Sequence, residues 1–489
     1  MLRRLTERLP PGRGERTALA ALLAVLAAGA ALRLWLMLAM RPALVGYADS
    51  YPYIGSAHGA LFGDPLRPAG YPLFLRVVHW VNANLSFTTL VQHGLGLASA
   101  LLLYLTARRF GVPRWWALLP AAAIALGGPQ ILIEHAPLTE AVFVFLQSAI
   151  VYLVARAAGE RDWAWAAAAG VVAGIAVTVR TLGLLLLAAA ALAVVVTPAD
   201  GWRRRVARAS AVLAAAAVIV GAYVVVHEQE TGYTGLTRAG GWNLYGRVAP
   251  FADCEEFDPP AGTRALCERR PPDDRPGPNS YIFDGAESPA VREFGNLFET
   301  TQAENDKVES FARAALRAQP LDWLDHVVTE DLVRYVSSEH LTRAAGQGLT
   351  FDGLQETLVS GPVGGQTMTL VSTYYSTSGQ YLHQGRFDAI TSYERATRPV
   401  GVLFVALALL ALLGLALARG RLRAGALVFT AVALVSIVGP PLTLFYDARY
   451  AIPAFGPLAA AAAVGGAALM ARVAAARERV ASGARERPT

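Results

Sequence analysis

Long apolar blocks alternate with short polar segments along most of the chain. Such blocks are long enough to cross the ~30 Å hydrocarbon core of a bilayer as helices. Hydropathy therefore predicts an all-α polytopic membrane protein with about ten transmembrane helices. The spans fall near residues 17–39, 87–107, 115–130, 138–156, 163–179, 182–197, 208–227, 398–418, 424–441 and 450–471.

The distribution of arginine predicts the orientation of these spans. The Arg-rich start of the chain precedes an apolar stretch longer than that of a signal peptide, so we expect a retained first helix whose N-terminus is cytoplasmic. The joints that then lie in the cytoplasm are rich in Arg, whereas the opposite joints 127–136, 181–183 and 440–446 carry none. This alternation follows the positive-inside rule and places both termini in the cytoplasm.

The same alternation places the long polar segment 228–397 outside, between the seventh and eighth spans. This segment contains both cysteines of the chain, Cys254 and Cys267. Because an extracytoplasmic compartment is oxidising, we predict that they form a disulfide. The bridge would close a loop of about 14 residues and stabilise the fold by roughly 3 kcal/mol. Two unrelated free thiols are the alternative.

The second half of the polar segment shows helical periodicity. An apolar face recurs at helical spacing from Val308 to Leu316, with Asn305 or Asp306 as the expected cap and Pro320 as the stop. A second helix is expected to follow it. The side chains that we expect to face inward from that helix are Trp323, Leu324, Val327, Val328 and Leu332.

We therefore predict four parts. They are an N-terminal transmembrane module 1–227 with an outer loop 40–86, an extracytoplasmic, mostly helical domain 228–397, three C-terminal spans 398–471 and a basic cytoplasmic tail 472–489. Composition agrees with a membrane protein, because only 16% of the residues are charged, against about 25% in soluble domains. The net charge of +6 lies in short clusters between apolar blocks and does not indicate nucleic acid.

Ionisable residues gather at the outer ends of the spans, where they are costly and mark function by default. Asp49 follows the first span closely and can act as a general base. Arg180 and Arg449 are fixed cations that can pair bidentately with a phosphate. Together they predict displacement at a carbon bearing a phosphate leaving group. The residues expected to position the acceptor or a divalent cation are Glu134, His135 and Glu140.

Four short motifs lie at these outer ends. They are Asp49-Ser-x-x-Tyr53-x-x-x-Ala57 followed by Arg67-Pro-x-Gly70-Tyr71-Pro72, then Pro137-Leu-Thr-Glu140, then Gly170-Val-Val-Ala-Gly174 ending in Arg180, and finally Asp447-Ala-Arg449-Tyr450. This set resembles the motifs of the bacterial GT-C glycosyltransferases. The family includes protein mannosyltransferase-like, lipid A aminoarabinose transferase-like and arabinofuranosyltransferase members.

The resemblance implies the GT-C fold and a multi-pass enzyme of the bacterial plasma membrane. Such an enzyme moves a sugar from a polyprenyl-phosphate donor to an acceptor hydroxyl on the extracytoplasmic face, with inversion and with Asp49 as the base. The acceptor can be a lipid, a polysaccharide or a protein. A divalent metal ion (Mg, Mn or Ca) near Asp49 and Glu140 is left open. By role, the other residues are Arg180, Arg449 and Tyr450 for the donor phosphate, and Tyr53, Arg67 and Tyr71 for support of the first loop.

Two other functions remain open from the sequence. An O-antigen ligase-like enzyme would move a whole glycan from a diphosphate carrier, and it also combines about ten spans with a large outer loop. A transporter or flippase of lipid-linked sugars would move its substrate without breaking a bond. Transporters tend to carry charges at mid-membrane on broken helices in repeated halves, whereas the acids here lie at the ends of the apolar blocks.

Overall fold

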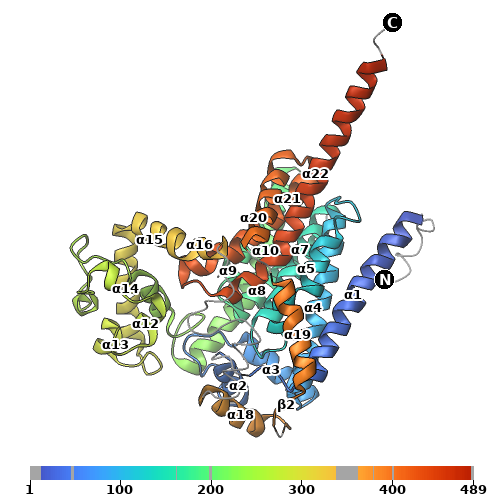
Figure 1. Cartoon of the computed structure of the whole chain (residues 1–489). Coiled ribbons are helices and arrows are strands. Elements are labelled where there is room, and N and C mark those ends of the chain that lie inside the picture. Colours follow the sequence, from blue (N-terminus) through green and yellow to red (C-terminus); the bar gives the residue numbers. More distant parts are fainter. Residues whose placement is uncertain are drawn as a thin grey trace.

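The fold is a bundle of long helices with a smaller helical unit beside one of its ends (Figure 1). The computed structural model describes residues 13–45, 49–160, 162–197, 201–336, 362–377, 379–398 and 401–485. Within these ranges the regular structure is helical apart from one two-stranded sheet. The prediction of an all-α polytopic membrane protein is confirmed.

The bundle is built from apolar helices that come from both halves of the chain. Its members are α1 (Arg13–Ala39), α4 (Leu85–Arg109), α5 (Leu118–Leu126), α6 (Gly128–Glu134), α7 (Glu140–Glu160), α8 (Trp163–Val179), α9 (Gly183–Val196), α10 (Trp202–Thr231), α20 (Gly401–Leu417), α21 (Gly420–Thr443) and α22 (Ile452–Arg485). The start of α1 and the end of α22 lie toward the same end of the bundle (Figure 1). The smaller unit lies toward the other end.

The number of full-length spans differs from the prediction. Among the described residues, six helices are long and apolar enough to cross a membrane, or seven if α19 (Gln384–Thr397) and α20 are counted as one bent span. Helices α8 and α9 are apolar but shorter. The count of about ten is therefore not confirmed.

The predicted span 115–130 is broken at Gly127. This residue has an extended ψ of 118°, which ends α5, and α6 starts anew with Pro129 in its first turn. Two consecutive glycines favour a helix poorly, and proline cannot donate a backbone hydrogen bond to the preceding turn. The break turns the short helix α6 into the core, where all its residues are buried.

Small residues bring α8 close to α10. A Cβ atom added at Gly174 would lie 2.8 Å from Cβ of Ile219 and 3.0 Å from the carbonyl oxygen of Ala216. Glycine at this position therefore allows the two helices to approach more closely than alanine would. The close contact fixes the far end of α8, which carries Arg180 as its C-cap.

The smaller unit has a hydrophobic core of its own, in which Trp242, Tyr245, Tyr281 and Phe311 are buried. It lies to the left of the bundle in Figure 1. Its elements are α11 (Gly240–Val248), α12 (Pro278–Phe283), α13 (Pro289–Phe294), α14 (Gln302–Ala318), α15 (Pro320–His326) and the 3-10 turns Arg264–Leu266 and Pro272–Asp274. The π-helical turn Val327–Leu332 and α16 (Val333–Val336) follow, and they contact α21 and α20 of the bundle.

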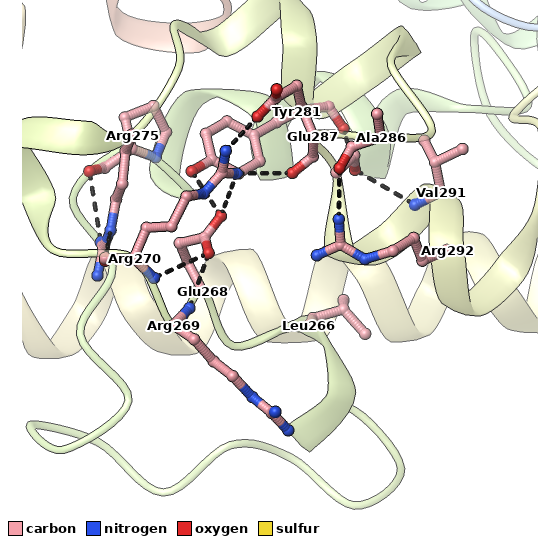
Figure 2. A network of polar contacts seen from close by, with 12 residues as sticks. Leu266, Glu268, Arg269, Arg270, Arg275, Tyr281, Ala286, Glu287, Val291 and Arg292 are labelled. Carbon is pink, nitrogen blue, oxygen red and sulfur yellow. Dashed lines mark hydrogen bonds and ion pairs between the residues drawn. The ribbon is translucent and has the colours of Figure 1, made fainter.

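The predicted disulfide between Cys254 and Cys267 is present in this unit. The loop that follows it is fastened by the carboxylate of Glu268 (Figure 2). Glu268 accepts hydrogen bonds from the backbone N–H of Arg269 and Arg270, and from the Tyr281 hydroxyl at 2.9 Å. The guanidinium of Arg270 bonds both Glu268 and Glu287. These bonds and the disulfide stabilise a Pro-rich stretch of chain that forms no α-helix or strand between α11 and α12.

Helix α14 buries the predicted face but begins earlier than expected. Val308, Phe311 and Ala312 are buried as predicted. The cap is Thr301, which forms a capping box with Glu304, so the expected caps Asn305 and Asp306 were wrong. In the next helix, Val327 is buried but Leu324 and Val328 are exposed. The π-helical turn that starts at Val327 changes the spacing on which those inward faces were predicted.

The segment 362–397 returns to the bundle. Helix α18 (Pro362–Tyr374) contacts α2 (Ser50–His58), α19 lies beside α1, and α3 (Gly70–Val81) contacts α2 and α4. Strand β1 (Met40–Arg41) pairs antiparallel with β2 (Tyr381–Leu382). The first loop therefore begins as a strand of this sheet, directly after α1, which lies beside α19. The predicted domain boundaries stay a prediction.

Candidate functional site

A cavity of about 1070 Å³ lies between the end of the bundle and the smaller unit. Its charged floor combines residues from distant parts of the chain. Asp49 is the N-cap of α2, Glu140 is the first residue of α7, and Arg180 is the C-cap of α8. Arg449 lies in the 3-10 turn Ala448–Ala451, directly before α22. The convergence of these residues on one pocket agrees with the pattern expected from the sequence.

Asp49 is held between two arginines. Its Oδ1 atom accepts a hydrogen bond from Arg67, and its Oδ2 atom forms an ion pair with Arg449. Burial of the carboxyl group disfavours its charge, but the guanidinium groups of Arg449 and Arg67 outweigh burial and hold the pKa of Asp49 well below its usual range. Asp49 is therefore a carboxylate whose proton affinity is low while both arginines remain beside it.

The second carboxylate of the cavity, Glu140, forms an ion pair with Arg180. The Nη1 atom of Arg180 donates to Oε1 of Glu140 at 2.8 Å, and Nε of Arg449 lies 3.8 Å from the same oxygen. The Arg180 guanidinium also lies over the Tyr450 ring, 5.0 Å from its centroid. Two arginines and Tyr450 are thus adjacent, as expected of a site for a phosphate, and in this structure acids hold both cations.

Asp447 completes this group and was not assigned a role from the sequence. Its Oδ2 atom lies 3.0 Å from Nε of Arg449, and its Oδ1 atom accepts a hydrogen bond from the Arg449 backbone N–H. Burial raises the pKa of Asp447 although Arg449 opposes the shift. Asp447 is the N-cap of the 3-10 turn that contains Arg449. An aspartate two residues before an arginine is a sequence signal that could have predicted both this cap and the ion pair.

The three residues expected to support the first loop lie together. Tyr53 lines the cavity and meets Tyr71 edge-to-face, with the ring centroids 5.0 Å apart. Tyr71 is fully buried and donates to Oε1 of Gln92 at 2.7 Å. Arg67 bonds Asp64 at 2.9 Å as well as Asp49. Asp64 thus orients the arginine that neutralises Asp49, a role that its position in the sequence did not reveal.

Glu134 and His135 do not line this cavity. Both side chains are fully buried between α1, α4 and α6. Arg33, in the last third of α1, donates to both carboxylate oxygens of Glu134 at 2.7 and 2.9 Å. His93 lies 3.0 Å from Glu134 and 3.1 Å from His135. The structure therefore separates these two residues from Glu140, with which the sequence analysis grouped them.

The acids of the cavity do not form a metal-ligand group. Within the described part of the chain, no cluster of three or more His, Cys, Asp or Glu side chains could hold a metal ion. Asp49 is paired with the guanidinium group of Arg449, and Glu140 with that of Arg180. Arginine therefore supplies the positive charge next to both carboxylates.

One family model matches part of the chain. Residues 80–225 match the family model described as dolichyl-phosphate-mannose-protein mannosyltransferase. The predicted resemblance to the GT-C glycosyltransferases is confirmed. The matched residues run from the end of α3 through α10 and contain Glu140 and Arg180, whereas Asp49 and Arg449 lie outside them.

The solved structures that this chain matches share little sequence identity with it. The Saccharomyces cerevisiae protein O-mannosyltransferase Pmt1-Pmt2 complex matches with 17% identity and a TM-score of 0.35, over 52% of this chain and 37% of that one. The Archaeoglobus fulgidus oligosaccharyltransferase matches with 14% identity and a TM-score of 0.45, over 94% and 52%. ArnT from Cupriavidus metallidurans matches with 13% identity and a TM-score of 0.31, over 94% and 78%. The chain thus spans about half or less of the first two. No curated protein matches it.

The remaining walls of the cavity were not foreseen. One wall is apolar and comes from the start of α9 and the end of α21, where Leu184 is 46% exposed. Another part of the lining is polar and belongs to α14 of the smaller unit. The apolar residues are Leu182, Leu184, Leu185, Pro440 and Leu444, and the polar ones are Gln302, Asn305, Asp306, Glu309 and Arg313. Periodicity marks α14 as amphipathic, but it cannot say that its polar face covers a cavity.

Proposed function

We propose that this protein is a membrane glycosyltransferase that moves a sugar from a polyprenyl-phosphate donor to an acceptor hydroxyl. One observation carries the proposal. In a single cavity, Asp49 lies beside Arg449, Glu140 lies beside Arg180, and an apolar wall adjoins these charged groups. A lipid-linked sugar phosphate has the matching parts, namely an anionic phosphate, a polar sugar and a hydrocarbon tail. The family match over residues 80–225 supports the same class of donor.

The donor phosphate is placed at Arg180 and Arg449. Guanidinium groups bind phosphate oxygens bidentately and remain charged at any physiological pH. Tyr450 lies beneath both, with its ring centroid 5.0 and 5.2 Å from the two guanidinium carbons. The tail would leave along the apolar wall between α9 and α21, where Leu184 and Leu185 line the cavity and are exposed.

The reaction is a single displacement with Asp49 as the base. The acceptor oxygen attacks the anomeric carbon on the face opposite the phosphate, and its proton passes to Asp49 as the new bond forms. The bond between the anomeric carbon and the phosphate oxygen breaks, and the lipid phosphate keeps the electron pair. Arg180 and Arg449 stabilise the negative charge that develops on this leaving group. One displacement inverts the anomeric configuration.

Donor binding would also make Asp49 a stronger base. In the donor-free arrangement Arg449 and Arg67 hold its pKa down. A phosphate that takes hydrogen bonds from Arg449 weakens the ion pair of this arginine with Asp49. Removing one nearby cation raises the proton affinity of a carboxylate. The base would thus reach its working strength only when a donor is bound.

The acceptor would enter from the side of the smaller unit. The polar face of α14 lines the same cavity as Asp49, so we expect it to contact the acceptor. We place the cavity on the extracytoplasmic face, as the distribution of arginine in the sequence predicts, and the acceptor is a lipid, a polysaccharide or a protein. Neither the sugar nor the acceptor is specified further by these residues.

The test is a transfer assay on the purified full-length protein in proteoliposomes. Radiolabelled polyprenyl-monophosphate and polyprenyl-diphosphate sugars are supplied with envelope extracts as acceptors, and the anomeric configuration of the product is determined. We expect transfer from the monophosphate with inversion. Transfer from the diphosphate alone would favour the ligase-like function. Movement of an intact labelled donor across the bilayer, with no product formed, would favour a flippase and contradict the proposal.

A further inference from the structure

A buried hydrogen-bonded relay connects Arg33, in the last third of α1, to the beginning of the first loop. It starts at Arg33, which is 2% exposed. Besides its two bonds to Glu134, the guanidinium donates to the carbonyl oxygens of Gly29, Ala125 and Ile124 at 3.0, 2.6 and 3.2 Å. All five of its N–H groups therefore have acceptors. Removing one partner of such a buried pair would leave the other charge buried without compensation.

Glu134 is saturated in the same way. Its Oε1 atom accepts from Arg33 and from Gln130 at 2.9 Å, and its Oε2 atom accepts from Arg33 and lies 3.0 Å from Nδ1 of His93. A carboxylate offers about four acceptor positions. Glu134 has none left for a substrate or a metal ion, so its function must lie inside this relay.

The two histidines join the carboxylate to the main chain of the first loop. Nε2 of His135 lies 3.1 Å from the carbonyl oxygen of Met40, which can only accept, so Nε2 carries the proton. Nε2 of His93 lies 3.1 Å from Nδ1 of His135. Nδ1 of His93 faces the carboxylate of Glu134 and donates to it. The relay therefore runs from Glu134 through both imidazole rings to Met40.

The end of the relay fixes the entry of the first loop. Besides the contact with Met40, the backbone oxygen of His135 accepts from the N–H of Leu44 at 2.9 Å. The hydroxyl of Thr89 donates to the carbonyl oxygen of Pro42 at 3.0 Å. The three bonds hold residues 40–44 against α4 and α6. The chain then continues toward Asp49.

A second branch reaches α2 from the other side. Nε2 of Gln92, one residue before His93, donates to the carbonyl oxygens of Glu134 and Ala136 at 2.8 and 2.7 Å. Its Oε1 atom accepts from the hydroxyl of Tyr71, which contacts Tyr53 on α2. The end of α6 is thus connected both to the start of the loop and to the helix whose N-cap is Asp49.

We propose that His93, Glu134 and His135 are positioning residues, which hold the first loop so that Asp49 faces the donor site. This inference rests on the proposed function only for its kinetic readout. It replaces the acceptor-binding role that the sequence suggested for Glu134 and His135. The bond from His135 to Met40 is the decisive contact, because through it the relay holds the loop's main chain.

Two substitutions of His135 separate this role from simple packing. The amide nitrogen of glutamine can take the place of Nε2, so His135→Gln retains a donor for Met40. The shorter asparagine reaches only the place of Nδ1, so His135→Asn keeps the contact with His93 and loses Met40. Both variants remove one aromatic ring from the same buried site. A role in packing alone would affect both to the same degree.

The first readout does not depend on activity. Hydrogen exchange by mass spectrometry is measured on peptides covering residues 40–58 of the full-length protein. We expect exchange at least tenfold faster in His135→Asn than in the unmodified protein, and little change in His135→Gln. The matched control is Gln147→Ala, which removes a buried amide bonded to Pro453 at 2.7 Å elsewhere in the bundle. It should leave these peptides unchanged.

The second readout is sugar transfer. We expect His135→Asn to lower kcat at least tenfold with the KM for the donor unchanged, and His135→Gln to retain most of kcat. Equal behaviour of the two variants in exchange and in kcat would overturn the inference. If the unmodified protein transfers no sugar, the proposed function fails, and the exchange comparison alone still decides whether the relay positions the loop.

Discussion

Arg449, near the end of the chain, forms an ion pair with Asp49, near its start. This contact joins the turn before α22 to the N-cap of α2 and closes the floor of the cavity. The ion pair keeps the proposed base, Asp49, ionised, and it holds Arg449, which is proposed to bind the donor phosphate, in position. Several consequences of this pairing can be measured.

A double-mutant cycle should reveal the coupling of Asp49 and Arg449. We expect Asp49→Asn and Arg449→Gln each to destabilise the folded protein by about 1–3 kcal/mol, because each leaves a charged partner less well satisfied. The double variant should be more stable than the sum of the two losses predicts, with a coupling energy of at least ~1 kcal/mol. Thermal unfolding in detergent measures all four proteins. Strict additivity would show that the two side chains do not interact.

The depressed pKa of Asp49 predicts how its contribution to stability depends on pH. An acid whose pKa is lower in the folded state stabilises the fold above its unfolded pKa, which is ~3.9 for Asp, and loses this stabilisation as pH falls toward the folded value. The difference in melting temperature between the unmodified protein and Asp49→Asn should therefore be constant from pH 5 to 8. It should shrink below about pH 4. A difference that changed around neutrality would mean that Asp49 is not held by its arginines.

Loss of Arg180 should weaken donor binding. Arg180→Gln removes a charge-assisted bond to the donor phosphate, worth about 1.5–3 kcal/mol, so the KM for the donor should rise about 10- to 100-fold. Arg180→Lys keeps the charge but not the planar guanidinium group. Its KM for the donor should therefore lie between those of the unmodified protein and Arg180→Gln. Titration of the donor in the transfer assay checks both. Arg292→Gln, at an exposed arginine of the smaller unit, is the control and should not change the KM.

Chelation of divalent ions should leave transfer intact. The carboxylates of Asp49 and Glu140 are each paired with a guanidinium group, which supplies the positive charge that a metal ion would otherwise bring. We expect the rate with excess EDTA to stay within about twofold of the untreated rate, since arginine can stabilise the leaving phosphate. A loss greater than tenfold that added Mg²⁺, Mn²⁺ or Ca²⁺ restores would require a metal in the mechanism.

The sequence predicted the convergence of Asp49, Arg180 and Arg449 because each follows or precedes an apolar block on the same side. Helix length and the positive-inside rule are enough to place such residues at one end of a bundle. The same reasoning misplaced Glu134. Its partner Arg33 lies inside an apolar span, and only the tertiary fold shows that the two charges neutralise each other.

Local backbone effects account for the other differences. Hydropathy alone could not detect that Gly127 ends α5, because the residues on both sides remain apolar. Thr301 and Glu304 form a capping box that is readable from sequence, but Asn305 and Asp306 offered equally acceptable caps one turn later. The apolar and polar walls of the cavity come from α9, α21 and α14, and their proximity is a property of the tertiary fold.

The most direct test of the account is the turnover of Asp49→Asn in the transfer assay. Asparagine keeps the size of the side chain and cannot accept the acceptor's proton, so turnover should fall at least about a hundredfold. The control is Asp162→Asn at the start of α8, because asparagine caps a helix as well as aspartate does. We predict that Asp162→Asn retains full turnover while Asp49→Asn loses it. Near-normal turnover of a folded, membrane-inserted Asp49→Asn protein would contradict the role of Asp49 as the base.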